Sequence, residues 1–371
     1  MASTTSGTKV DLDQVAYFLI TGASRGIGQR MAIETARRFR AGSIVVLLAR
    51  SASGLESTRA EILEVNPHIT VVTSSVDLSN ASRELLEDII GKSLGKKPVE
   101  SFGLAAIVHN VGTIGNVERK AIDMADRQEW EEYFATNVIT VGVLNSCFLR
   151  RFGECPRKLV VNITSKACLV PFKSMGFYCS GKAAREMYFK VLADEEPDLV
   201  VLNYSPGPVD TDMTVDIQGR SNAEEIRAYF KGLRDTTTML TTHQTTAKFL
   251  SVLEAGQFKS GDHSRVTLPV LITAGFMILN FRWEVEINIH TERIAIQGVD
   301  DGRGGGGGGG ANRVAGVAAI DYSLEESWES TDEDEDDDEY DEDEETEYDS
   351  EGDDEDLSTD DELRRISLVT F

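Results

Sequence analysis

The sequence predicts an α/β fold in which helices cover both faces of a doubly wound parallel sheet, as a single domain with a disordered acidic C-terminal extension. Short apolar runs of strand length alternate with helical patterns between residues 15 and 254, as in parallel sheets whose crossovers are helices. A glycine-rich turn at 21–28 joins the first apolar run to the first helical pattern. Residues 331–356 contain 20 acidic side chains and no Lys or Arg, so only −6 of the net charge of −26 belongs to the rest of the chain.

Six strands are expected, with helices between them. The first run, 15–20, is almost continuously apolar, which is typical of a strand buried on both faces of a parallel sheet. The other expected strands are 43–48, 69–73, 104–108, 158–163 and 199–204. Expected helices follow the glycine turn to about residue 40 and cover 53–65, 79–94, 128–151 and 242–254. Residues 214–240 are expected to form a mobile segment over the substrate. Such sheets bind ligands at the carboxyl ends of their strands.

The glycine-rich turn is the candidate cofactor site. Gly22, Gly26 and Gly28 allow the backbone to turn tightly and to approach a pyrophosphate at the N-terminus of the following helix. A glycine cluster can also be a purely structural turn, but its place between a buried strand and a helix favours nucleotide binding. The predicted cofactor contacts of the turn are Gly22, Ser24, Arg25, Gly26, Ile27 and Gly28.

The end of the second expected strand indicates which dinucleotide is bound. An NAD-preferring site usually carries an acidic residue there, whereas this chain has Arg50. Arg50 and Arg25 could together clasp a 2′-phosphate through guanidinium hydrogen bonds. NADPH is therefore the expected cofactor, and the alternative is that both arginines are merely solvated.

Tyr178 and Lys182 are the candidate catalytic pair. In a helix, positions i and i+4 lie on the same face, so the phenol and the ammonium would share one small site. A neighbouring cation favours phenolate and is expected to lower the pKa of Tyr178. Tyr178 could then pass a proton to a carbonyl oxygen as a hydride arrives at its carbon. A Y-x-x-x-K pattern alone is weak evidence, because such pairs are common on helix surfaces.

Several motifs in a fixed order make the catalytic interpretation specific. They are T-G-x-x-x-G-x-G at 21–28, H-N-V-G at 109–112, Ser165 placed 13 residues before Tyr178, and S-P-G at 205–207. This series resembles the short-chain dehydrogenase/reductase family, and the resemblance implies a Rossmann-type fold. It extends over roughly residues 15–263.

The resemblance implies a role for each matching residue. Ser165 would hold the substrate carbonyl beside Tyr178, and Lys182 would tune the phenol and bind ribose. Asn137 would hold a water linked to the lysine, unless it is an incidental mid-helix asparagine. His109 is expected to be packed rather than catalytic, and Asn110 could also belong to a simple Asn-x-Gly turn. The cofactor groove would further include Asp77 and Leu78 at the adenine, Asn110, Gly112, Pro206 and Gly207, and Val209 and Thr211 at the nicotinamide carboxamide.

Some stretches are similar, more narrowly, to the pterin-reducing members of this family. They are 171–173, 178–187, 193–197, 202–213 and 257–261. This similarity implies NADPH-dependent reduction of side-chain carbonyls on a pterin, in the last stage of tetrahydrobiopterin synthesis, by a homodimer in the cytoplasm. Met175 and Met213 would lie near the substrate opening, although core packing explains a Met equally well.

The narrower similarity stops after His263. Pterin-reducing relatives continue with a short strand whose aspartate anchors the guanidine-like edge of the pterin, whereas Arg265 stands at that place here. An alternative function is therefore a broader NADPH-dependent carbonyl or diketone reductase of the same family. A second alternative is a non-catalytic, cofactor-binding scaffold whose acidic segment captures a basic protein.

Composition argues against several other classes. The mildly acidic body gives no basic surface for nucleic acid. The apolar run 266–281 is interrupted and shorter than the ~20 residues of a membrane helix, so no membrane segment is expected. No metal site is expected either, because the cysteines lack C-x-x-C spacing, and reduced thiols in the cytosol are the simplest account of them. These cysteines are Cys147, Cys155, Cys168 and Cys179.

The predicted organisation has four parts. Residues 1–14 form a flexible N-terminal arm, and residues 15–263 form the NADP-binding reductase domain. Residues 264–298 form a divergent apolar segment of unknown structure. Residues 299–371 form a glycine-rich linker and a disordered acidic tail, because such a composition cannot bury enough apolar surface to fold.

Overall fold

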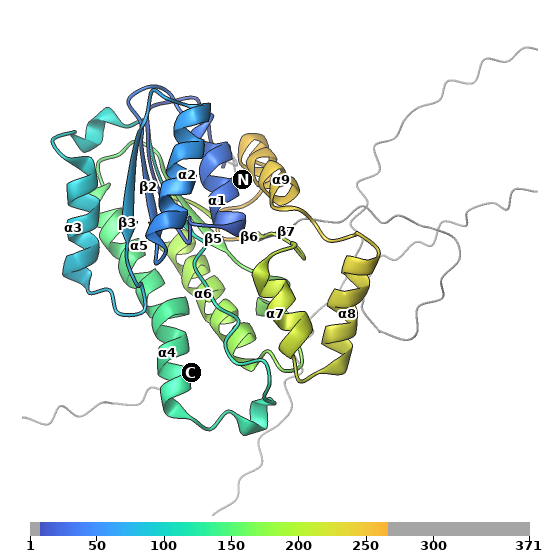
Figure 1. Ribbon diagram of the computed structural model, residues 1–371. Coiled ribbons are helices and arrows are strands. Elements are labelled where there is room, and N and C mark those ends of the chain that lie inside the picture. Colours follow the sequence, from blue (N-terminus) through green and yellow to red (C-terminus); the bar gives the residue numbers. More distant parts are fainter. Residues whose placement is uncertain (1–7, 266–371) are drawn as a thin grey trace, which may run out of the picture. The chain divides into compact units, whose positions relative to one another are not determined.

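The computed structural model describes residues 8–265, all of which belong to one compact unit (Figure 1). The expectations for residues 1–7 and for 266–371, including the glycine-rich linker and the acidic tail, lie outside the described residues. Of the divergent segment, only residues 264 and 265 are described.

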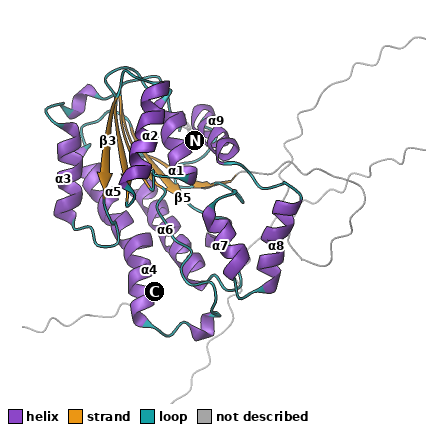
Figure 2. Cartoon of the chain, in the orientation of Figure 1, coloured by secondary structure: helices purple, strands orange, loops and turns teal. Residues whose placement is uncertain are grey.

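Within residues 8–265, a parallel sheet of seven strands forms the centre, with the order β3-β2-β1-β4-β5-β6-β7. Figure 2 shows this central sheet with helices around it. The predicted doubly wound α/β fold is therefore confirmed. Chain order reverses between β1 and its neighbour β4, which opens a crevice at the carboxyl ends of these strands. The strands are β1 Ala16–Thr21, β2 Ile44–Ala49, β3 Thr70–Ser75, β4 Leu104–His109, β5 Lys158–Ile163, β6 Val200–Ser205 and β7 His263–Arg265.

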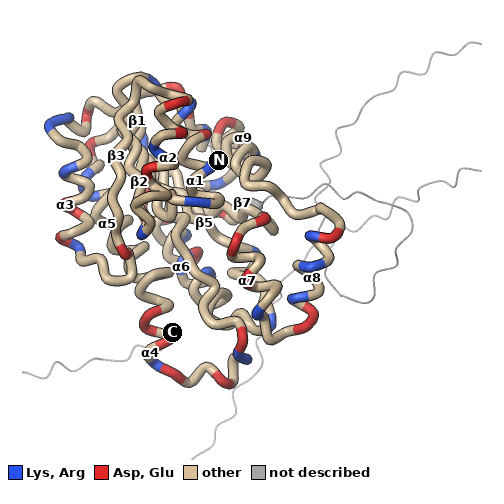
Figure 3. Tube along the Cα trace, viewed as in Figure 1, with Lys and Arg blue, Asp and Glu red and all other residues tan. Residues whose placement is uncertain are grey.

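Helices cover both faces of this sheet. The α-helices are α1 Gly26–Ala36, α2 Ala52–Val65, α3 Arg83–Leu94, α4 Arg127–Phe134, α5 Thr140–Arg151, α6 Gly176–Glu195, α7 Asp212–Arg220, α8 Glu224–Asp235 and α9 Thr242–Ala255. Short helical turns are η1 Val99–Ser101, η2 Ala121–Asp123, η3 Ala135–Ile139 and η4 Lys166–Cys168. In the described chain no helix has the length and apolar composition needed to cross a membrane. Outer helices such as α3 and α8 carry both basic and acidic side chains (Figure 3).

Successive side chains of the buried strands point to opposite faces of the sheet, and among the described residues they contribute to a separate hydrophobic core on each face. In β1, Phe18 and Ile20 pack with α1, α2 and α9 on one face, while Tyr17 and Leu19 pack with α3, α5 and α6 on the other. All six β1 residues are buried, as the continuous apolar run predicted. The sheet is thus a rigid base from which the carboxyl-end loops project.

The expected helix 128–151 is interrupted by a π-helical turn, η3, between α4 and α5. Asn137 lies in this turn, where its side chain donates to the carbonyl of Tyr133 at 2.8 Å. The Thr140 hydroxyl donates to the carbonyl of Ala135 at 2.9 Å. The helical pattern of apolar residues continues across the π-turn, so the sequence did not reveal the interruption. Turns of this kind are frequent at functional sites.

Residues 214–240, expected as a mobile segment, form most of α7 and all of α8. Ile217, Ile226 and Phe230 bury their side chains in a third, smaller cluster beside the crevice. Apolar residues at helical spacing therefore fold this segment onto the domain.

The expectation of a flexible arm does not hold for residues 8–14. Val10 and Leu12 are buried in the core on the α9 face, and the Val10 N–H donates to the Leu253 carbonyl at 2.9 Å. Apolar side chains at alternate positions dock this stretch, together with hydrogen bonds of 2.7 Å from the Thr8 hydroxyl to the carbonyls of Gly256 and Phe258. The last strand, β7, was also not expected; it pairs with β6 through Asn203 and His263.

Candidate active site

Tyr178 and Lys182 lie one turn apart on α6, as expected. The Lys182 Nζ lies 5.5 Å from the centroid of the Tyr178 ring. It donates a hydrogen bond of 2.6 Å to the carbonyl of Ile163, the last residue of β5, and the side chain is buried. The ammonium therefore lies beside the ring while it is held by the end of the strand that precedes Ser165.

The expected lowering of the Tyr178 pKa is not what the structure shows. Burial raises the pKa of Tyr178, while a hydrogen bond with Ser165 and the charge of Arg185 oppose the rise. Burial and the charge of Arg185 likewise hold the pKa of Lys182 well below its usual value. The physical reason is that Lys182 points its donor at a backbone carbonyl, so the cost of removing both groups from water dominates their mutual attraction.

Ser165 and Asn137 meet this pair from two other segments. Ser165 caps η4, accepting from the Ala167 N–H at 3.2 Å, and hydrogen-bonds Tyr178. Asn137 is held by the N–H of Thr113, which donates to its Oδ1 at 2.8 Å. A Cβ added to Gly112 would lie 3.2 Å from Asn137 Oδ1 and 4.0 Å from Lys182 Nζ. The residues expected to be catalytic are therefore brought together around the carboxyl ends of β4 and β5.

The glycine turn forms the second half of the site, at the carboxyl end of β1. Gly22 and Gly26 have φ of +67° and +62°, which favour glycine. A Cβ at Gly28 would lie 2.3 Å from the Gly22 carbonyl oxygen and 2.4 Å from Asn110 Nδ2, so only glycine fits there. Asn110 donates to the carbonyls of Thr21 and Gly22 at 3.0 and 3.3 Å. Asn110 thus braces the turn itself.

The N-terminus of α1 is suited to an anion. Its N-cap residue, Arg25, makes no side-chain capping hydrogen bond, whereas α2 and α3 are capped by Ser51 and Ser82. The first N–H groups of α1 therefore keep their capacity to bind a phosphate. The chain thus fits a dinucleotide at this turn. Ser24 and Ile27 complete the turn, and both are partly buried.

Comparison with known proteins agrees with this geometry. A family model described as short chain dehydrogenase matches residues 16–222. The chain belongs to the short-chain dehydrogenase family. Sepiapterin reductase of Xenopus tropicalis is 36% identical over 247 residues, which cover 66% of this chain and 94% of the relative. A benzil reductase ((S)-benzoin forming) of Bacillus subtilis is 26% identical over 245 residues, which cover 64% and 93%.

Solved structures show the same fold. The KRED1-Pglu enzyme matches with a TM-score of 0.57 and 25% identity over 67% of this chain and all of that one. A short chain dehydrogenase from Shigella flexneri 2a, complexed with NADP, matches with a TM-score of 0.56 and 24% identity over 69% of this chain and 99% of that one. The chain is thus an oxidoreductase of a family that binds nicotinamide cofactors.

Other cofactor residues expected in a short-chain dehydrogenase line the same edge of the sheet. Thr211 lies over the glycine turn, because a Cβ at Gly26 would be 3.9 Å from its Cγ2. Arg25 forms an ion pair of 2.7 Å with Asp212, which ties the turn to α7. In the preceding loop, Gly207 has φ of +77° and the Val209 carbonyl accepts from Thr214 Oγ1 at 3.1 Å. The carbonyl of Pro206 accepts from Thr245 Oγ1 at 3.0 Å.

Arg50 and Asp77 lie past the ends of β2 and β3. The Arg50 side chain is exposed, and its carbonyl accepts from the Ser75 hydroxyl at 2.9 Å. Hydrogen bonds from the N–H and hydroxyl of Ser79 lower the pKa of Asp77, with a smaller contribution from Arg50. The buried Leu78 offers its carbonyl to the Thr140 hydroxyl.

Met175 and Met213 belong to the cluster between the catalytic helix and the α7–α8 segment. Met175 is buried there, while Met213 and Tyr178 are partly buried and pack against the same cluster. Both methionines therefore lie on the Tyr178 side of the crevice. Met175 is a packed core residue of this cluster, whereas Met213 is only partly buried in it.

Arg185 is the functional residue that sequence reasoning missed. It is 1% exposed, and each of its three nitrogens donates to a fixed acceptor: the carbonyls of His109 and Val111 at 2.6 and 2.9 Å, and Asn162 Oδ1 at 3.0 Å. Tyr178, Lys182 and Arg185 fall at positions i, i+4 and i+7, so helical periodicity placed a second cation on the face that carries Tyr178. That spacing was the available signal.

His109 is packed, as expected, with its ring against Phe189 and its Nε2 within 3.2 Å of Asn145 Oδ1. Burial and the charge of Arg185 lower the pKa of His109 to about 3, so the folded protein keeps the ring neutral.

The unfolding free energy is expected to fall as the pH drops from about 6.5 to about 3, because the unfolded chain then binds a proton that the folded chain excludes. In His109→Gln, we expect the decrease in the free energy of unfolding between about pH 6.5 and about pH 3 to be smaller than in the wild type by about 3–5 kcal/mol. Urea unfolding across this pH range measures it, with the exposed His68→Gln as the control. Equal slopes in the two variants would contradict the assignment.

Proposed function

We propose that the protein reduces a side-chain carbonyl of a pterin, such as sepiapterin or 6-pyruvoyl-tetrahydropterin, with NADPH in tetrahydrobiopterin synthesis. The observation that carries the proposal is the arrangement of Ser165, Tyr178 and Lys182 at the carboxyl end of β5, in a chain related to sepiapterin reductases over the whole catalytic domain. The cofactor, when bound, supplies a hydride.

The residues divide the remaining chemistry among them. Ser165 hydrogen-bonds the substrate carbonyl and holds it beside Tyr178, which donates the proton to the carbonyl oxygen. Arg185 supplies positive charge that stabilises the phenolate left behind, and Lys182, with its Nζ 5.5 Å from the centroid of the ring, tunes the phenol from the next helical turn. Asn137, fixed by the backbone of Thr113, orders a water that returns the proton through Lys182. Because burial raises the Tyr178 pKa in the protein alone, Tyr178 starts the reaction as a protonated acid.

Tyr178→Phe removes the proton donor and leaves the ring packing intact. We expect kcat for sepiapterin reduction to fall by a factor of about 10² to 10⁴, with NADPH affinity largely unchanged. Tyr188→Phe on the same helix is the matched control, because its hydroxyl only accepts from Asn145 at 3.2 Å. Turnover retained in Tyr178→Phe would rule out the assigned acid.

The preference for NADPH rests on Arg50, which is exposed beyond β2 and near enough to Asp77 to lower the pKa of that carboxyl. Arg25, by contrast, is engaged with Asp212. We therefore assign the 2′-phosphate chiefly to Arg50.

Arg50→Asp is expected to raise the KM for NADPH by about tenfold or more, equivalent to about 1.4 kcal/mol, and to change the KM for NADH far less. Arg127→Asp, an exposed reversal on α4, controls for net charge. Steady-state kinetics with both cofactors make the measurement. Parallel changes in the two KM values would mean that Arg50 does not read the phosphate.

A broader carbonyl or diketone reductase is the second candidate. Two points favour it: the benzil reductase relative, and Arg265 in β7, which by the family resemblance stands where pterin-reducing relatives carry an acidic anchor. A cation cannot accept the hydrogen bonds that the guanidine-like edge of a pterin donates.

If the second candidate holds, kcat/KM for benzil exceeds that for sepiapterin. Arg265→Asp should then raise kcat/KM for sepiapterin by about 10- to 100-fold, the worth of a hydrogen bond to a charged group, without improving turnover of benzil. A wild-type protein that already prefers sepiapterin would exclude this candidate.

We also propose a homodimer in the cytoplasm. Three apolar side chains, Ile139 beside α5 and Met187 and Val191 on α6, are 58%, 61% and 47% exposed, and a partner subunit seated on these helices would cover them. All four cysteines are free thiols, which agrees with a reducing compartment such as the cytoplasm. Sedimentation of the full chain as a monomer at micromolar concentration would contradict the dimer.

A further inference from the structure

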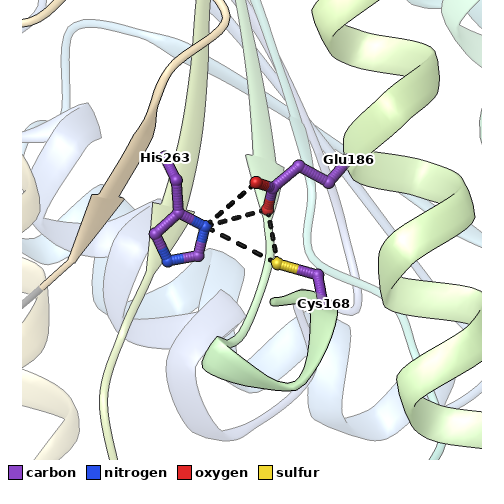
Figure 4. A group of neighbouring side chains, drawn as sticks. All are labelled: Cys168, Glu186 and His263. Carbon is purple, nitrogen blue, oxygen red and sulfur yellow. Dashed lines mark hydrogen bonds and ion pairs between the residues drawn. The ribbon is translucent and has the colours of Figure 1, made fainter. Parts of the chain in front are cut away.

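Three side chains of types that can bind a metal converge from separate elements (Figure 4). Cys168 ends η4, Glu186 lies on α6 and His263 begins β7. The Glu186 Oε2 lies 2.8 Å from Cys168 Sγ and 2.9 Å from His263 Nδ1, and the thiol sulfur lies 3.6 Å from the same ring nitrogen. Glu186 is buried, and the His263 side chain is 11% exposed.

The arrangement differs from a nucleophilic relay. In a catalytic triad, the nucleophile and the carboxylate bind opposite nitrogens of the imidazole, so that one nitrogen takes the proton of the nucleophile while the carboxylate orients the ring. Here both groups face Nδ1 of His263, as Figure 4 shows. Three donor atoms of different chemistry therefore point toward one another, as ligands of a single ion do.

The spacing fits zinc. Ligand distances of about 2.3 Å for sulfur and about 2.0–2.1 Å for nitrogen place the two donors about 3.6 Å apart at a tetrahedral angle, and Cys168 Sγ and His263 Nδ1 are 3.6 Å apart. The Glu186 carboxylate would withdraw by somewhat less than about 1 Å to reach its own position at about 2.0–2.2 Å. Mixed thiolate, imidazole and carboxylate donors favour Zn²⁺ over Mg²⁺ or Ca²⁺, which take oxygen ligands.

We propose that Cys168, Glu186 and His263 form a Zn²⁺ site with a fourth position open to water. The thiolate and the carboxylate balance the charge of the ion, and binding releases the thiol proton. The Thr164 hydroxyl donates to Glu186 Oε2 at 2.7 Å and orients the carboxylate from outside the ligand set. Lys190 Nζ, 3.2 Å from Glu186 Oε1, is the competing cation, and its side chain is 40% exposed, so it has room to move away.

The ion would affect the reaction only by holding the segments that carry Ser165 and Lys182 in place. Ser165 precedes Cys168 by three residues, and Lys182 precedes Glu186 by one helical turn. A bound ion would therefore fix the catalytic serine segment, the catalytic helix and the last described strand against one another.

Cobalt titration of the full chain, kept reduced by a phosphine, tests the site. One equivalent of Co²⁺ is expected to produce thiolate-to-cobalt charge-transfer absorption, which Zn²⁺ abolishes by displacement. The acidic segment 331–356 can bind cations only through carboxylates, so it gives no such band. Cys168→Ser should lose the band, while Cys179→Ser, the matched control at a partly buried free thiol, should keep it.

Competition with Zn²⁺ gives a second readout. His263→Ala is expected to weaken zinc binding at least about tenfold, and Lys190→Ala to strengthen it by removing the competing charge. A wild-type protein without the thiolate band, or a band that survives Cys168→Ser, would show that the three residues form a hydrogen-bond network only. The wild-type titration decides the matter even if a variant fails to fold.

Discussion

The guanidinium of Arg185 is the contact on which the site depends. It joins α6 to the carboxyl ends of β4 and β5, because its donors reach the carbonyls of His109 and Val111 and the side chain of Asn162. Asn162 in turn donates to Asn203 Oδ1 at 2.9 Å, and Asn203 donates to the Gly261 carbonyl at 2.8 Å. One buried charge and two amides thus fix α6 across three strands.

Burying Arg185 is costly, and burial lowers its pKa to about 10, which still leaves it charged at neutral pH. When such a network is complete, its net contribution to the free energy of unfolding is small, because the hydrogen bonds mainly offset the cost of burying the polar groups. Removing one partner is costly, because it leaves the other buried groups unpaired. The network therefore contributes position more than stability. Its charge also acts on Lys182, Tyr178 and His109, so one residue sets both the geometry and the electrostatics of the crevice.

The helix α6 serves two polar clusters at once. Tyr178, Lys182 and Arg185 face the crevice, while Glu186 gathers Thr164, Cys168 and His263 behind it. Burial alone would raise the pKa of Glu186, but hydrogen bonds from His263, Cys168 and Thr164 outweigh it and lower the value to about 2. The carboxylate is therefore ionised and fully engaged, which locks β7 to the helix.

Local patterns in the sequence were sufficient for the fold and for the first contacts of the site. Apolar runs located six of the seven strands of residues 8–265 within one or two residues, because most of these strands are buried on both faces; β3, at the edge of the sheet, is only partly buried. The glycines at 22 and 26 were identifiable because their positive φ excludes most other residues. The i,i+4 spacing placed Tyr178 and Lys182 on one face of a helix, and the structure confirms that proximity.

Tertiary structure decided what depends on contacts between distant segments. The pKa of Tyr178 follows from burial and from where Lys182 aims its donor, neither of which spacing on a helix reveals. The short strand β7, the docking of residues 8–14, and the meeting of Cys168, Glu186 and His263 each join segments far apart in the chain. Sequence periodicity reports which face of an element is buried, but only the packed sheet determines which faces meet.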